Sequence, residues 1–164
     1  MTTSTSTDQA ATAYRPTGYT TLTPFLSVNG AAQAIDFYTS VFGARLVSKT
    51  DGPDGTIAHA ELELEQGRFQ LGDPVEAYGL AAPTDADATT FSLAIYVPDC
   101  DATLAAAQEA GATVREPAST FVTGDRFASV RDPFGVRWSI MTRVEDVSDE
   151  EAERRVKEWM EQQG

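Results

Sequence analysis

The stretch LTPFLSVNGAAQAIDFYTSVFGARLV, residues 22–47, decides the fold because it joins a strand, a helix and a second strand in one unit. Residues 25–28 read as the first strand, and apolar side chains then recur near helical spacing up to Gly43, a residue type that ends helices. Asn29 precedes the helix and is expected to cap its first turn. With a strand at 45–49, the stretch predicts a β-α-β unit.

The same unit occurs a second time along the chain. Val97 stands 69 residues after Val28, and Gly111 stands 68 residues after Gly43. The sequence between Val97 and Gly111 predicts a helix that the glycine again ends. Two copies are too few for a stacked repeat array, so one pseudo-symmetric domain is the better interpretation.

Further alternating segments extend each half to four strands. The predicted strands are 25–28, 45–49, 57–64 and 68–71 in the first half and 91–97, 112–116, 126–131 and 136–142 in the second, with a second helix at 99–110 and an irregular stretch at 117–124. Each half is therefore a βαβββ module, and the fold class is α+β.

The domain boundaries follow from changes in composition. We predict a disordered leader at 1–17, modules at 18–75 and 90–143, a linker at 76–89 and a helical tail at 144–164. Ser148 and Glu151 match a capping box at the start of the tail helix. An apolar stripe on that helix comprises Ala152, Val156, Trp159 and Met160.

Composition limits the class of partner. The 164 residues suit one domain, and 25 acidic against 12 basic residues give a formal net charge of -13, which repels nucleic acid and anionic membranes. The single cysteine, Cys100, cannot form a disulfide within the chain, and no apolar run is long enough to span a membrane. We expect a cytoplasmic protein that binds a small neutral or cationic molecule.

Strand alternation sorts the side chains into two faces. We expect the helices to cover the more apolar face, formed by Ala58, Ala60, Leu62, Leu64, Phe69, Leu71, Phe91, Leu93, Ile95 and Val97. The other face carries His59, Glu61, Glu63, Gln70, Ser92, Ala94 and Tyr96, and on the last strand Arg137, Ser139 and Met141 share one side. Such a mixed lining suits a binding cavity, and a merely solvated face is the equal alternative.

Several short motifs together resemble the vicinal oxygen chelate superfamily of glyoxalases, bleomycin-resistance proteins and extradiol dioxygenases. They are the helix AIDFY at 34–38, VFGA at 41–44, EAGA at 109–112 and DPFGVRW at 132–138. HAE at 59–61 and GDR at 124–126 are similar to the PhnB-like branch. The resemblance implies that the two modules form a curved mixed sheet around a shared cavity.

The resemblance also implies where a metal would bind. Metal-dependent members carry four ligands, which here correspond to Thr23, Gln70, Ser92 and Ser139. Three hydroxyls and one amide are poor ligands for a catalytic divalent ion. We therefore predict that the metal site is lost and that no cofactor is bound, unless a non-standard metal site exists.

The remaining candidate residues are weighed from their chemistry. His59, the only histidine, shares a strand face with Glu61, and the two are the candidate catalytic pair against the alternative of a half-exposed histidine. Arg126 would clamp an anionic group of a ligand or pair with Asp125 or Asp132. The predicted ligand-binding residues are Thr23, Phe25, Gln70, Ser92, Tyr96, Arg126, Ser139 and Met141.

Three functions stay open at this point. The first is a protein that binds or sequesters a small molecule, as drug-resistance members of the superfamily do. The second is a lyase, isomerase or dioxygenase type of enzyme with a rearranged site around His59 and Glu61. The third is an assembly protein that uses the tail helix. Exposed strand edges also predict a homodimer.

Overall fold

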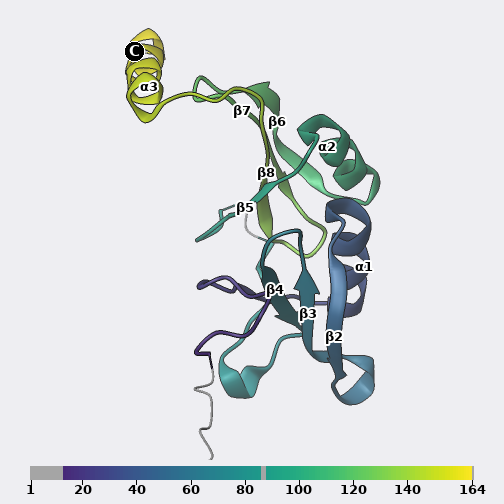
Figure 1. Cartoon of the computed structure of the whole chain (residues 1–164). Coiled ribbons are helices and arrows are strands. Elements are labelled where there is room, and N and C mark those ends of the chain that lie inside the picture. Colours follow the sequence, from purple (N-terminus) through teal and green to yellow (C-terminus); the bar gives the residue numbers. More distant parts are fainter. Residues whose placement is uncertain (1–12, 86–87, 164) are drawn as a thin grey trace, which may run out of the picture.

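The computed structural model describes residues 13–85 and 88–163 (Figure 1). The elements are β1 (Phe25–Ser27), α1 (Ala31–Phe42), β2 (Arg45–Asp51), η1 (Pro53–Gly55), β3 (Ile57–Glu63), β4 (Arg68–Gly72), η2 (Glu76–Tyr78), β5 (Leu93–Tyr96), α2 (Cys100–Glu109), β6 (Thr113–Thr120), β7 (Asp125–Arg131), β8 (Arg137–Arg143) and α3 (Asp149–Gln163). Residues 1–12 of the predicted leader and 86–87 of the predicted linker lie outside the described residues.

The strands form two four-stranded mixed sheets of identical topology. The first has the order β1-β4-β3-β2 and the second β5-β8-β7-β6. β1 runs parallel to β4, and β5 runs parallel to β8, whereas the other neighbours are antiparallel. Two βαβββ modules and a C-terminal helix confirm the predicted α+β class.

The helices α1 and α2 lie next to each other on the same side of the sheets (Figure 1), and the core lies beneath them. Tyr38 of α1 is fully buried, and its ring contacts Phe69 of the first module and Trp138 of the second. Its hydroxyl donates to Asp132 Oδ2 at 2.7 Å, and Trp138 Nε1 donates to the same oxygen at 2.9 Å. One core therefore extends through both modules.

The cap of α1 differs from the prediction. Gly30, in the left-handed conformation with a φ of 79°, occupies the cap position, and the cap has no side-chain hydrogen bond of its own. Instead Asp73 Oδ1 accepts hydrogen bonds from the backbone N–H groups of Gly30 at 3.0 Å and Ala31 at 3.2 Å. Asn29 was the wrong residue because the capping carboxylate comes from the segment after β4.

Two strands also differ from the alternation. A register shift between Thr50 and Asp51 turns Ala58 outward and buries Ile57 at 3% exposure, so Ala58 does not belong to the helix-covered face. β5 begins at Leu93, which leaves Phe91 before the strand and 55% exposed rather than under a helix. The β-bulge at the Thr50–Asp51 register shift reverses the face that the side chains beyond it occupy.

The predicted irregular stretch at 117–124 is wrong in its first half. β6 continues to Thr120, with register shifts on both sides of Glu116 and as far as Ser119. Pro117 lies in this irregular part of an edge strand, where its missing N–H breaks no regular ladder.

The tail helix α3 begins as predicted, because Ser148 Oγ accepts a hydrogen bond from the N–H of Glu151 at 3.3 Å. It lies at the far end of the second module (Figure 1). The ring of Trp159 contacts Phe121 with centroids 5.3 Å apart, and Arg155 forms an ion pair with Glu145. Within the described residues, no helix combines the length and the hydropathy that crossing a bilayer requires.

Candidate functional site

The side of each sheet that faces away from α1 and α2 is its open face. On β3, His59, Glu61 and Glu63 are half-buried while Ala60 and Leu62 between them are fully buried, so the predicted alternation is confirmed here. Register brings further side chains to the same face. Gln70 of β4 lies opposite Glu61 on one side and opposite Phe25 of β1 on the other.

A tyrosine from the segment before β1 completes this group. The Tyr19 hydroxyl donates a hydrogen bond to Glu61 Oε1, and Gln70 Nε2 donates to the same hydroxyl at 3.4 Å. The Arg68 guanidinium lies over the Tyr19 ring, 5.1 Å from its centroid. We name Tyr19, Phe25, His59, Glu61, Arg68 and Gln70 the first-sheet cluster.

The sequence analysis missed Tyr19 and Arg68. Tyr19 lies between the predicted leader and the first strand, where no periodicity marks it. Its only signal was a lone aromatic residue ahead of a strand. Arg68 begins a strand, and its contacts come from a neighbouring strand, which alternation along one segment cannot reveal.

Charges in the cluster are largely paired. Arg68 donates to Glu63 Oε1 at 3.0 Å and to Glu61 Oε2 at 3.4 Å. Hydrogen bonds from Arg45 and then from Arg68 hold the pKa of Glu63 below its usual value. Arg45 and Arg68 together balance the charges of Glu61 and Glu63, so the cluster favours a cationic or hydrogen-bond-donating group through the acceptor oxygens of Glu61 and not through a surplus of negative charge.

His59 and Glu61 share the open face but have different neighbours. The His59 ring lies 6.0 Å from the Phe25 ring, centroid to centroid, at an interplanar angle of 35°. Glu61 instead contacts Tyr19 and Arg68. The pair therefore offers a small aromatic surface beside a hydrogen-bonded carboxylate.

The open face of the second sheet holds four more of the predicted ligand-binding residues. Ser139 lies opposite Ala94 of β5, and Met141 lies opposite Tyr96. Tyr96 is 62% exposed. Ser92 is exposed and immediately precedes β5.

Arg126 is separated from these residues. Its guanidinium donates to the Asp101 carboxylate of α2 through two hydrogen bonds of 2.8 and 2.7 Å, which lowers the pKa of Asp101. Arg126 thus lies on the helix side of β7. The predicted pairing with Asp125 or Asp132 is wrong: Asp125 pairs with Arg143, and Asp132 binds Tyr38 and Trp138.

A hollow of about 120 Å³ lies where the two sheets meet. Its lining includes Arg68 of the first-sheet cluster and Ala94, the partner of Ser139. Four positions correspond to the metal ligands of metal-dependent members, and we name them the corner residues: Thr23, Gln70, Ser92 and Ser139. They are not part of this lining. Gln70 lies opposite Phe25, and Ser139 lies opposite Ala94. Thr23 and Ser92 precede the strands β1 and β5 and are not in register with Gln70 and Ser139.

The donor set does not fit a divalent metal. The corners carry hydroxyls and one amide, whereas zinc and iron sites use imidazole, thiolate or carboxylate. Within residues 13–85 and 88–163, no three His, Cys, Asp or Glu side chains are grouped so that they could hold a metal ion. These residues therefore do not form a site for a catalytic metal ion.

Cys100 has a structural environment. It is buried, and its thiol donates to the carbonyl of Ile140 at 3.3 Å. Burial and then the neighbouring Asp101 carboxylate raise the pKa of this thiol. A protonated, buried thiol is a poor nucleophile.

Known proteins share this architecture. Residues 18–140 match the Glyoxalase/Bleomycin resistance protein/Dioxygenase superfamily. An uncharacterized protein of Mycobacterium bovis, Mb0911c, is 37% identical over 133 residues, which are 79% of this chain and 88% of the relative. The structure of TioX from Micromonospora sp. ML1 has a TM-score of 0.59 and 27% identity over 74% of this chain and 97% of its own. The structure of the PhnB protein from Bacillus cereus has a TM-score of 0.57 and 22% identity, and the match covers 75% of this chain and 99% of that protein. This likeness shows the fold alone.

Proposed function

This chain belongs to the Glyoxalase/Bleomycin resistance protein/Dioxygenase superfamily, and on that premise we propose that it binds a small organic molecule on its open face without a metal ion. The family assignment confirms the resemblance in the sequence. The observation that carries the proposal is the first-sheet cluster, in which aromatic rings, an amide and a carboxylate share the open face. The amide, Gln70, is at one of the four positions where metal-dependent relatives are expected to place ligands.

The cluster favours one class of ligand. A flat ring stacks on the Phe25–His59 surface, and a cationic or N–H donor on that ring bonds to Glu61. The net charge of -13 raises the local concentration of cations and disfavours anionic ligands. We therefore propose an aromatic amine or a larger cationic compound that carries such a ring.

Other residues of the open faces orient this ligand. The Tyr19 hydroxyl and Arg68 hold the Glu61 carboxylate in place, and the remaining lone pairs of that carboxylate are left for the ligand. The Tyr19 hydroxyl in turn accepts a hydrogen bond from Gln70. The exposed Tyr96 and the half-buried Met141 of the second sheet supply apolar area for the rest of the molecule.

Calorimetric titration tests the proposal with two named ligands, bleomycin and benzamidine, in buffer with a chelator. We expect saturable binding that weakens about tenfold in Phe25→Ala and in Glu61→Gln, because each interaction is worth about 1–2 kcal/mol. Tyr78→Ala, which removes an exposed ring on η2 far from the cluster in sequence, is the matched control and should bind as the wild type does.

Two outcomes would count against the proposal. One is the absence of saturable heat with either ligand. The other is binding that appears only when Zn²⁺, Ni²⁺, Fe²⁺ or Mn²⁺ replaces the chelator, because that would require a metal that the donor set does not predict.

A further inference from the structure

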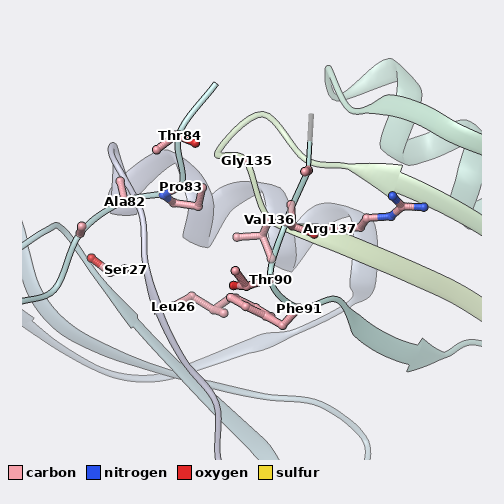
Figure 2. A pocket seen from close by; sticks show the side chains of 13 residues that line it. Leu26, Ser27, Ala82, Pro83, Thr84, Thr90, Phe91, Gly135, Val136 and Arg137 are labelled. Atoms are coloured by element: carbon pink, nitrogen blue, oxygen red, sulfur yellow. The ribbon is translucent and has the colours of Figure 1, made fainter. Parts of the chain in front are cut away.

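A second hollow of about 230 Å³ lies at the junction of the modules (Figure 2). Leu26 and Ser27 of β1 line it from the first module. Phe91, which precedes β5, and Val136, which precedes β8, line it from the second. Pro83 of the connecting segment lies on the opposite side from Leu26 and Phe91 in Figure 2. This volume is enough for roughly seven water molecules, or a compound of about ten non-hydrogen atoms.

The wall that carries Pro83 is fixed to the second module. Gly135 has a φ of 91°, and a Cβ atom there would lie 2.8 Å from Pro83 Cβ, so the Pro83 side chain packs directly against the Gly135 backbone. The Arg131 guanidinium also donates to the carbonyl of Thr84. The hollow is thus bounded by packed segments.

Ser27 presents polar groups at this junction that lack partners. The Pro24 carbonyl and the Val28 N–H bond to β4, so alternation directs the Ser27 N–H and C=O toward the other edge of β1. In the described part of the chain β1 pairs with β4 alone, and the Ser27 Oγ is shielded from solvent without a hydrogen-bond partner. A buried polar group left unpaired costs free energy that a bound partner recovers.

Among residues 13–85 and 88–163, the rest of the lining is mainly apolar and carries no free charge. Leu26 and Val136 are each only 3% exposed as residues, so their side chains form a preformed floor and wall. Of the charged residues that the structure describes, only Arg137 lines the hollow, and its guanidinium donates to Ser129 at 3.0 Å and to Glu116 at 2.7 Å. A charged ligand would therefore lose its hydration without gaining a counterion.

We propose that this junction is a second binding site, which takes a small, neutral, largely apolar molecule with one alcohol or amide group that bonds to the Ser27 Oγ. The site is separate from the first-sheet cluster because its lining contains no member of that cluster. It takes uncharged ligands, whereas the first-sheet cluster suits cationic ones.

Methyl NMR tests the site with benzyl alcohol and toluene, which differ by one hydroxyl. We expect saturable shifts of the Leu26 and Val136 methyl signals with both, and a dissociation constant about 3–10-fold lower for benzyl alcohol. Ser27→Ala should remove this preference while toluene still binds. Ala82→Leu, which fills the hollow, should abolish both titrations, whereas Ala58→Leu on the exposed bulge of β3 is the matched control.

The proposal is overturned if neither compound gives saturable shifts in the wild type, or if benzyl alcohol keeps its preference in Ser27→Ala. Binding that survives Ala82→Leu would also overturn it, since the ligand would then sit elsewhere. The His59 imidazole signal should not move in these titrations. A failure at the open face is thereby distinguished from a failure at the junction.

Discussion

At the scale of single residues, Tyr38 and Asp132 join the two modules by one buried hydrogen bond of 2.7 Å. Burial first, and then the Asp132 charge, raise the pKa of Tyr38 well above the ordinary tyrosine value. The hydroxyl stays protonated in the folded chain but ionises in the unfolded chain above about pH 10. The stability that it contributes is therefore present below that pH and lost as the pH rises.

This difference predicts the alkaline behaviour. Above about pH 10 the free energy of unfolding of the wild type should fall by about 1.4 kcal/mol more per pH unit than that of Tyr38→Phe, measured by urea denaturation. The other tyrosines are common to both proteins and cancel in the comparison. Parallel pH profiles for the two proteins would show that the Tyr38 hydroxyl also ionises in the folded state.

At the scale of elements, the start of α1 depends on Asp73. Its Oδ1 accepts hydrogen bonds from Gly30 and Ala31, and its Oδ2 accepts one from the N–H of Ile57 at 2.8 Å. Asp73→Ala should lower the free energy of unfolding by about 2–3 kcal/mol in urea, because a helix cap and a strand contact are lost together. Asn29→Ala is the control and should stay within about 0.5 kcal/mol. Equal losses in both variants would restore Asn29 as a contributor to the cap.

Elements also show what the sequence can predict. Period and breaker residues located the three α-helices and, apart from the second half of β6, the strands, because those signals lie within a few residues of one another; η1 and η2 were not predicted. The Asp73 cap and the β3 bulge were not predictable, since each depends on a segment brought close only by folding. The same limit applies to the site. Alternation placed His59 and Glu61 on one face, but Tyr19 reaches Glu61 across 42 positions of the chain.

At the scale of the whole molecule, the homodimer stays a prediction. Phe91, which precedes β5, and Tyr96, the last residue of β5, have exposed rings. Exposed apolar area of this kind favours association between subunits. We expect light scattering to give twice the chain mass, and truncation after Val147 to leave that state unchanged, because α3 contacts its own module through Trp159 and Arg155. A monomeric truncated chain would instead assign the interface to α3.

The central claim is that the open face binds its ligand without a metal, and the imidazole of the single histidine reports on it most directly. The measurement is a benzamidine titration of the untagged protein in EDTA, followed by the His59 ring protons in NMR. We expect a saturable shift of these protons. Glu61→Gln should raise the dissociation constant from this titration about tenfold, and added Mn²⁺ should not lower it. An unmoved His59 signal at saturating benzamidine and bleomycin, or a shift that requires the metal, would contradict it.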